Sequence, residues 1–281
     1  MSNQASCLCG SVRWEISAEP FHAFNCHCKL CRKAHGSAFA TYWFVKADQF
    51  KWLSDTNTIV QYRSSPLLTR SFCGSCGSVV PYASEQGSHW VSPGGCHDDG
   101  KSSDCHIFVA HRAPWYEITG DLPQHDDYPE YTGMQRVEEE PLPSGPEGAV
   151  RGSCMCHAVK YHVVEPFKVV HNCHCQRCRR ARAAAHATNG FTSMSGVQFI
   201  QGENNLASYK VTDAEYFTQV FCQTCGSKMP RLDPGREVAV IPFGGLDDDP
   251  RARAVDHIFT DYKANWYEIT DDLPQYAEGP G

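Results

Sequence analysis

The chain has 281 residues, enough for two domains of ordinary size, and a formal net charge of −7 at pH 7. This charge argues against nonspecific nucleic-acid binding, which needs basic patches to neutralise phosphates. No apolar run approaches the roughly 20 residues that a membrane span needs, and the N-terminus lacks the features of a secretory signal. We therefore expect a cytoplasmic protein with a small-molecule substrate, and neither nucleic acid nor membrane among its partners.

The predicted elements of the N-terminal part are short strands separated by turns and cysteine motifs. A turn at Cys7-Leu8-Cys9 precedes an alternating run that ends at Ile16, and a loop from His35 leads into an aromatic strand ending at Val45. Further strands are expected over 58–62, 67–72, 79–82 and 106–109. Because no long amphipathic helix is found, the predicted class is mainly β with short helical turns.

The same motifs are present twice in the same order. Asn25-Cys26-His27-Cys28-Lys29-Leu30-Cys31-Arg32-Lys33 recurs as Asn172-Cys173-His174-Cys175-Gln176-Arg177-Cys178-Arg179-Arg180. The offset between the copies grows from 147 at Cys7 and Cys154, through 149 at Cys73 and Cys222, to 151 at Trp115 and Trp266. Agreement that preserves order over this length identifies a tandem duplication.

The expected domains are a first copy at 1–124, a linker at 125–150 and a diverged second copy at 151–281. The linker is rich in Pro and Gly and carries Glu138-Glu139-Glu140, a composition typical of solvated chain rather than of a folded element. Duplicated domains often bury equivalent faces, so we expect the two copies to pack on each other in a monomer.

The 16 cysteines indicate metal binding. Disulfides are the alternative, but the absence of a secretory signal and the Cys-x-Cys and Cys-x-x-Cys spacings favour metal in a reducing compartment. Two sets of four combine both spacings and predict closed, structural zinc sites. A thioredoxin-like redox pair at Cys73 and Cys76 would need a βαβ context that is not present. The sets are Cys7, Cys9, Cys73 and Cys76 in the first copy, and Cys154, Cys156, Cys222 and Cys225 in the second.

Two sets of three cysteines remain, one thiolate short of a tetrahedral set. An open fourth position is how catalytic zinc sites are built, so the chain is expected to hold up to four zinc ions. Three thiolates make a poor Lewis acid but suit a further thiolate, and a metal-bound thiol is deprotonated at neutral pH. The favoured chemistry is making or breaking a bond to a substrate's sulfur. The sets are Cys26, Cys28 and Cys31, and Cys173, Cys175 and Cys178.

Histidines are weaker candidates for these sites. His27 and His174 lie between two ligands, so chain geometry directs them away from the metal. His106 and His257 either reach the metal or pack beside their strand, and we favour packing. Cys96 and Cys105 have no cysteine at the matched position of the second copy and are interpreted as incidental thiols.

These motifs resemble those of the glutathione-dependent formaldehyde-activating enzyme family, which includes S-(hydroxymethyl)glutathione synthase-like and centromere protein V-like members. The resemblance is carried by Cys-x-Cys-Gly-x-Val at 7–12, Cys-His-Cys-x-x-Cys-Arg-Lys-x-x-Gly-Ser at 26–37, Phe-Cys-x-x-Cys-Gly-Ser at 72–78 and His-Ile-Phe at 106–108. It implies two tandem β-tent zinc-binding domains. It also implies a structural zinc at each four-cysteine set, a labile catalytic zinc at each three-cysteine set, and glutathione as co-substrate. The implied reaction joins glutathione to formaldehyde and is formally that of a carbon–sulfur lyase.

The second copy departs from the family pattern beside its three cysteines. His35-Gly36-Ser37 becomes Arg182-Ala183-Ala184, and Phe39 becomes His186, which is either a polar group in a reshaped pocket or a surface residue. We therefore expect the first copy to be the better-kept site. The candidates for catalysis beyond the zinc sites are His35, His106, His186 and His257.

Three functions remain open at this point. The first is a zinc-dependent carbon–sulfur lyase acting on a glutathione adduct or a related small electrophile. The second is a zinc-dependent lyase or isomerase of specialised metabolism that does not use glutathione. The third is a non-enzymatic zinc-binding interaction module, against which stands the lack of a basic or low-complexity tail. The acidic runs at 98–99 and 247–249 are typical of solvated turns and supply no evident general base.

Overall fold

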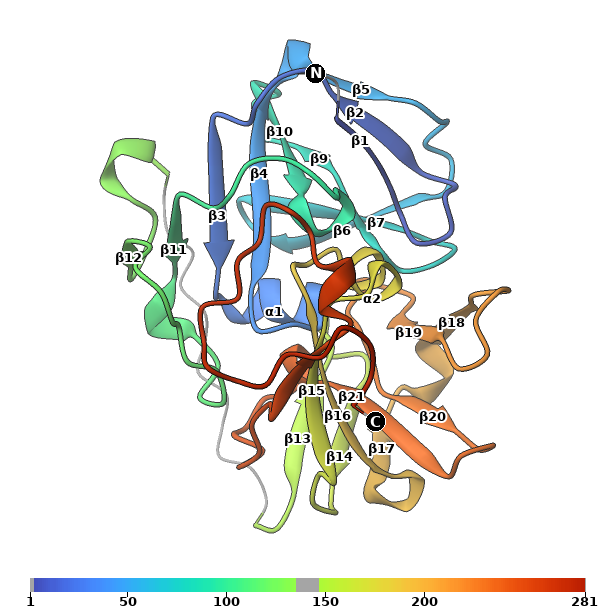
Figure 1. The fold of residues 1–281 in the computed structure, drawn as a ribbon. Helices are drawn as coiled ribbons and strands as arrows, with labels where there is room; N and C mark the ends of the chain where they lie inside the picture. Colours follow the sequence, from blue (N-terminus) through green and yellow to red (C-terminus); the bar gives the residue numbers. More distant parts are fainter. Residues whose placement is uncertain (1–2, 135–146, 281) are drawn as a thin grey trace.

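A computed structural model of the chain describes residues 3–134 and 147–280. It confirms the mainly β class. In Figure 1 the first copy, coloured blue to green, occupies the upper part, the second copy occupies the lower part, and the helices α1 (Lys29–His35) and α2 (Gln176–Arg182) lie near the middle. The strands of the first copy are β1 (Asn3–Ser6), β2 (Arg13–Ile16), β3 (His22–Cys26), β4 (Ala40–Lys46), β5 (Phe50–Trp52), β6 (Ile59–Ser65), β7 (Leu68–Cys73), β8 (Val79–Val80), β9 (Tyr82–Ala83), β10 (His89–Pro93), β11 (Cys105–Ile107) and β12 (Gln124–His125).

The second copy repeats this order with small losses. Its strands are β13 (Val150–Ser153), β14 (Lys160–Val163), β15 (Val169–Cys173), β16 (Ala187–Ser193), β17 (Val197–Gln201), β18 (Leu206–Lys210), β19 (Thr218–Cys222), β20 (Arg231–Asp233), β21 (Val238–Pro242) and β22 (Asp256–Ile258). Single turns of 3-10 helix lie at Ala47–Gln49, Gly94–Cys96, Val109–His111, Glu130–Thr132, Met194–Gly196, Glu203–Asn205, Phe243–Gly245 and Thr260–Tyr262.

One sheet in each copy carries the three-cysteine motif. Its order is β12-β11-β3-β4-β10-β9 in the first copy and β20-β21-β16-β15-β22 in the second. β3 pairs in parallel with β11, which sets Asn25 opposite His106, and β15 pairs in the same way with β22, which sets Asn172 opposite His257. The parallel pairing therefore places each of these histidines beside the start of a three-cysteine motif.

A short helix follows each of these strands and was not predicted as such. Cys28 caps the N-terminus of α1 and its Sγ accepts the backbone N–H of Cys31 at 3.4 Å; Cys175 and Cys178 do the same for α2. Two thiols thus precede the helix and the third lies in its first turn.

The predicted loop begins only after His35, because α1 extends through that residue. The strand expected over 106–109 also ends early, since Phe108 has a left-handed backbone with φ 58°.

The two copies contact each other reciprocally. Each Cys-x-x-Cys-Gly turn, at 73–77 and at 222–226, is called a cysteine knuckle here, and its glycine lies against a phenylalanine of the other copy. A Cβ on Gly77 would stand 2.5 Å from the ring of Phe221, and one on Gly226 would stand 2.6 Å from that of Phe72. Both glycines have positive φ, which side chains disfavour, so these positions combine backbone freedom with close approach. The two rings pack edge to face with centroids 6.3 Å apart.

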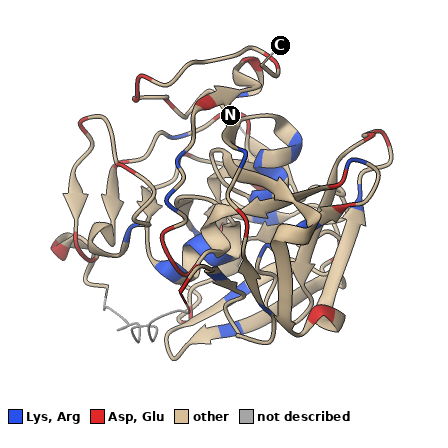
Figure 2. Cartoon of the chain, turned by 90° about the horizontal axis from the view of Figure 1, so that it is seen from below, with Lys and Arg blue, Asp and Glu red and all other residues tan. Residues whose placement is uncertain are grey.

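Charged groups also join the copies. Figure 2 shows where lysine, arginine, aspartate and glutamate residues occur along the chain. Lys33 Nζ lies 2.7 Å from Asp247 Oδ1 with both side chains buried, and Arg179 Nη2 lies 2.6 Å from Asp98 Oδ1. These carboxylates belong to the acidic runs that were expected to be solvated turns. They are interface partners instead, because a cation of the other copy faces each of them.

The expected linker is ordered near its start. Tyr128 is partly buried and its ring packs edge to face on Phe108, with centroids 4.8 Å apart. It lies against the apolar cluster that includes Cys26 and Cys31. The expectation of wholly solvated chain is therefore wrong for this residue. Residues 135–146, including Glu138-Glu139-Glu140, lie outside the described residues.

We expect the protein to lose stability as the pH falls below about 6.5, in part through His97. Its buried ring bonds Asn3 Oδ1 at 2.8 Å, and burial lowers its pKa to about 3. The unfolded chain then binds a proton that the folded chain excludes, so stability is present above the unfolded pKa and is lost as the pH falls. Between pH 7 and pH 5 this histidine contributes a loss of about 2 kcal/mol. Urea unfolding of His97→Gln should show a correspondingly smaller loss; an equal loss in the two proteins contradicts the assignment.

In residues 3–134 and 147–280, every helix is too short or too polar to cross a membrane.

Candidate metal centres and their cavity

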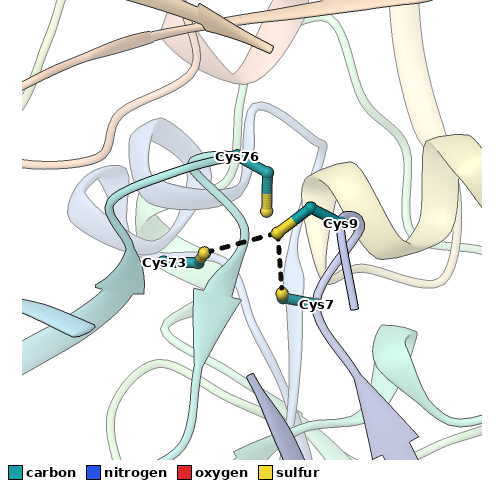
Figure 3. Close-up of side chains that lie close together, drawn as sticks. All are labelled: Cys7, Cys9, Cys73 and Cys76. Carbon is teal, nitrogen blue, oxygen red and sulfur yellow. Dashed lines mark hydrogen bonds between the residues drawn. The ribbon is translucent and has the colours of Figure 1, made fainter. Parts of the chain in front are cut away.

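The four-cysteine sets each gather into one cluster. Figure 3 shows the side chains of Cys7, Cys9, Cys73 and Cys76 directed toward a common point, with Cys9 Sγ 3.5 Å from Cys7 Sγ and 3.8 Å from Cys73 Sγ. All four sulfur atoms lie within 4.8 Å of one another, and Cys154, Cys156, Cys222 and Cys225 form the same arrangement in the second copy. Four converging thiols at this spacing fit a tetrahedral zinc ion.

The three-cysteine sets gather in the same way at the start of each helix. The sulfur atoms of Cys26, Cys28 and Cys31 lie within 4.8 Å of one another, as do those of Cys173, Cys175 and Cys178. Hydrogen bonds from the neighbouring thiols, chiefly that of Cys173, lower the pKa of Cys175 to about 3. Within the described residues, no histidine or carboxylate lies close enough to complete either set. These sets therefore fit a metal ion that retains one position for a further ligand.

The histidines expected near these sites pair with each other instead. His27 Nε2 lies 2.8 Å from His106 Nδ1, and His174 Nε2 lies 2.8 Å from His257 Nδ1. His257 Nε2 lies 3.0 Å from the carboxylate of Asp271. Because a carboxylate accepts, Nε2 of His257 donates to Asp271. The matched position of Asp271 in the first copy is Gly120, so His106 has no such carboxylate there.

His35 and His186 occupy different environments. His35 Nε2 lies 2.8 Å from the hydroxyl of Tyr42, and its Nδ1 lies 3.0 Å from the carbonyl of Ala183 in the other copy. His186 is buried between the copies, 5.5 Å from the ring of Phe39 and 5.3 Å from that of His174. The alternative of a surface residue is wrong for His186. Burial lowers its pKa to about 3, so it is neutral at pH 7.

The first-copy thiols have an arginine beside them that sequence reasoning missed. Arg70 on β7 donates from Nη1 to the hydroxyl of Tyr42 at 2.9 Å and from Nη2 to Sγ of Cys31 at 3.3 Å. Hydrogen bonds from Cys26 and Cys28, and then the charge of Arg70, hold the pKa of Cys31 well below its usual range. Only the fold brings β7 to α1, so no local motif marks this arginine.

The second-copy thiols line a cavity of about 900 Å³. Its wall includes Cys173, Cys175 and Cys178 together with Arg182 from the end of α2 and Gln219 from β19. The arginine was noted in the sequence as a departure from the family pattern, without a role. A space of this size accommodates a small organic molecule.

Comparison with known proteins agrees with this architecture. The family described as glutathione-dependent formaldehyde-activating enzyme matches residues 2–111 and 149–262, which is most of the chain. The chain belongs to this family. The two matched segments correspond to the two copies, so the family resemblance expected from the motifs is confirmed.

Individual relatives of the family are distant. A protein of Halomonas elongata, provisionally named a glutathione-dependent formaldehyde-activating enzyme, is 28% identical over 127 residues, which cover 43% of this chain and 80% of that protein. A Schizosaccharomyces pombe protein named as an uncharacterized lyase is 27% identical over 86 residues, covering 31% of this chain and 61% of that one. A crystal structure of a Rhodobacter sphaeroides protein shares 24% identity and a TM-score of 0.30, covering 37% of this chain and 98% of the other.

Proposed function

We propose that the chain is a zinc-dependent carbon–sulfur lyase acting on a glutathione adduct of formaldehyde or of a related small electrophile. The observation that carries the proposal is that three clustered thiols, one ligand short of a tetrahedral set, line a cavity large enough for a small molecule. Membership of the family supports the same chemistry. The names of the two relatives, one a formaldehyde-activating enzyme and one a lyase, agree with it.

The donor set fits zinc, and Cys173, Cys175 and Cys178 would hold it. When bound, the ion supplies a positive centre that stabilises a thiolate placed beside it. In the synthetic direction the substrate's sulfur forms a bond to the carbonyl carbon, the π electrons of the C=O bond move to oxygen, and the proton that leaves the thiol ends on that oxygen. In the lyase direction the C–S bond breaks and the same proton returns to sulfur. Atoms and electrons balance without an oxidant or a reductant.

The surrounding residues have defined parts in this proposal. The paired rings of His174 and His257 are fixed by Asp271 on one side and pack beside the motif that holds the thiols. The parallel pairing of β15 with β22, which sets Cys173 opposite Ile258, positions the backbone at the first thiol. Burial lowers the pKa of His186 to about 3, so its neutral ring adds no positive charge beside His174.

We expect the protein, purified without a chelator, to contain up to four zinc ions per chain, because the two kinds of cysteine set each occur twice. Addition of glutathione should change the rate at which a chelating dye removes zinc from the three-cysteine sets, since the thiol takes the open position. Elemental analysis and a zinc-release assay measure both quantities. Two ions per chain, both indifferent to glutathione, contradict the proposal and favour a zinc-binding interaction module.

Turnover is measurable at equilibrium. Carbon-13 exchange spectroscopy follows the interconversion of formaldehyde hydrate and S-(hydroxymethyl)glutathione, and the zinc-loaded chain should accelerate it above the spontaneous rate. Protein treated with a chelator and then freed of it serves as the control. An exchange rate equal to the spontaneous one in the zinc-loaded protein rules out this substrate pair.

A further inference from the structure

The two three-cysteine sets differ in how their buried polar groups are satisfied. In the first copy, the positions around the thiols carry His35, Tyr42 and Arg70, and these side chains bond one another and Cys31. The matched positions in the second copy carry Arg182, Asn189 and Gln219. The guanidinium has therefore moved from the strand to the end of the helix, and the histidine and the tyrosine are gone.

This exchange leaves donors without acceptors in the second copy. Arg182 Nη2 donates to Oδ1 of Asn189 at 3.1 Å, but its Nη1 has no hydrogen-bond partner among the described residues. Nε2 of Gln219 has none either, and both side chains are buried in the wall of the cavity. Burial lowers the pKa of Arg182 only to about 10, so the group is charged at pH 7. A buried donor without an acceptor is destabilising, and more so when it is charged.

The outer charges of the cavity are already paired. Arg177 lies 3.3 Å from Asp213, and Arg236 lies 2.7 Å from Asp233. Arg231 is 3.5 Å from the same Asp233. Arg180 Nη2 lies 3.7 Å from Asp98, although its buried Nε has no hydrogen-bond partner among the described residues. The acids Glu215 and Glu278 also line the space. Among these cavity-lining arginines, the guanidinium with no carboxylate partner in the described residues is therefore that of the buried Arg182.

The corresponding face of the first copy is covered by the chain that follows it. Tyr128 packs on the apolar cluster containing Cys26 and Cys31, and Leu68 and Met134 pack against the same cluster. That cluster holds two of the three thiols, so the ring of Tyr128 lies beside the first-copy set. The matched position in the second copy is Gly279, where an added Cβ would meet nothing within 4 Å.

We propose that the second-copy cavity is the substrate site of this chain and that Arg182 and Gln219 bind a carboxylate of the substrate beside the three thiols. The inference rests on the proposed function in taking the substrate to be a thiol or a thiol adduct. A planar guanidinium with a free N–H and an amide N–H in the wall of the same cavity suit a carboxylate, which accepts at both oxygens. Arg182 is then the residue that selects for acidic substrates. This reverses the expectation that the first copy is the better-kept site.

Two small thiols test this in the zinc-loaded full chain by titration calorimetry. Mercaptosuccinate carries two carboxylates and 2-mercaptoethanol carries none. We expect mercaptosuccinate to bind at one site per chain and at least about 10-fold more tightly, a difference of about 1.4 kcal/mol. Arg182→Met should remove that advantage and leave 2-mercaptoethanol binding unchanged. Two equivalent sites per chain, or an unchanged preference in Arg182→Met, overturn the proposal.

Matched variants distinguish loss of the carboxylate-binding site from a general loss of positive charge and from unfolding. Arg63→Met removes one exposed positive charge of the first copy and should retain the preference. Arg70→Met tests whether the ligand binds beside the first-copy thiols. If this variant loses mercaptosuccinate binding, the site belongs to the first copy and the proposal is overturned. If Arg182→Met loses zinc or unfolds, Gln219→Leu decides, because it keeps the arginine and removes only the amide donor. A preference unchanged in folded Gln219→Leu also overturns the proposal.

The exchange assay with glutathione and formaldehyde distinguishes this inference from the proposed function. Carboxylate-dependent binding without turnover in the wild-type chain rejects the reaction and supports the site. Turnover with an unaltered KM for glutathione in Arg182→Met supports the reaction and rejects the site.

Discussion

Cys175→Ser is expected to lower the rate of S-(hydroxymethyl)glutathione exchange by at least about 100-fold, equal to about 2.7 kcal/mol in the activation barrier. The residue supplies the thiol with the lowered pKa in the set that lines the cavity, and serine is a poor replacement for a thiolate ligand. The variant should keep its thermal midpoint to within a few degrees, because its four-cysteine set is intact. Exchange spectroscopy and differential scanning fluorimetry measure the two effects.

Two further substitutions serve as controls for Cys175→Ser. Cys28→Ser makes the same change in the first copy and should lower the rate much less, because Tyr128 packs over that set. Cys225→Ser removes one thiol of the buried four-cysteine cluster and should release zinc and unfold the second copy, since structural zinc contributes directly to folding. If Cys175→Ser and Cys225→Ser both unfold the protein, the division into open and closed sites is wrong.

Lys33→Met is expected to destabilise the chain by about 3 kcal/mol. Lys33 is buried between the copies, where its Nζ contacts Asp247 at 2.7 Å and donates to the carbonyl and the hydroxyl of Ser153 at 2.6 and 2.7 Å. Removing one partner of a buried pair leaves the other charge uncompensated, which costs 3–5 kcal/mol on average. Lys29, at 3.6 Å from the same carboxylate, moderates the loss. The free energy of unfolding in urea measures it.

The control for Lys33→Met is an ion pair of similar length at the surface. Arg63 and Glu85 are 2.8 Å apart but largely exposed, so Arg63→Met should cost less than about 1 kcal/mol. The double variant with Asp247→Leu should recover most of the stability lost in Lys33→Met, because no buried charge then remains unpaired. A double variant as unstable as the sum of the two single ones argues that packing, not charge, dominates at this position.

The spacing of cysteines carried most of the information that the sequence held about the site. The Cys-x-Cys turn before β2 and the Cys-x-x-Cys turn after β7 belong to different sheets, yet their thiols converge on one point, as the combination of the two spacings predicted. The duplication allowed each motif of one copy to be compared with its counterpart in the other. It showed that Cys96 and Cys105 are not matched in the second copy, and the structure places neither in the cysteine clusters that could hold metal.

The residues that distinguish the two three-cysteine sites could not be predicted from cysteine spacing or from the duplication. Arg70 lies 39 positions from Cys31 and carries no motif, so its contact with the sulfur depends on how β7 packs on α1. Tyr128 belongs to a segment whose composition resembles solvated chain. The two acidic runs contain partners of the other copy's cations, a relation that exists only once the copies are docked. In each case the missing information was long-range packing rather than local pattern.

The reciprocal contact of the two knuckles affects how the sequences of the two halves can diverge. In a symmetrical pair of identical subunits, a substitution at one site is necessarily made at the other. Here Gly77 meets Phe221 and Gly226 meets Phe72 with the same geometry, yet both halves are encoded separately in one chain. Each half can keep the shared packing while its own site varies. Arg182 and Tyr128 are changes of this kind, each present in one half alone, and the common interface supports both.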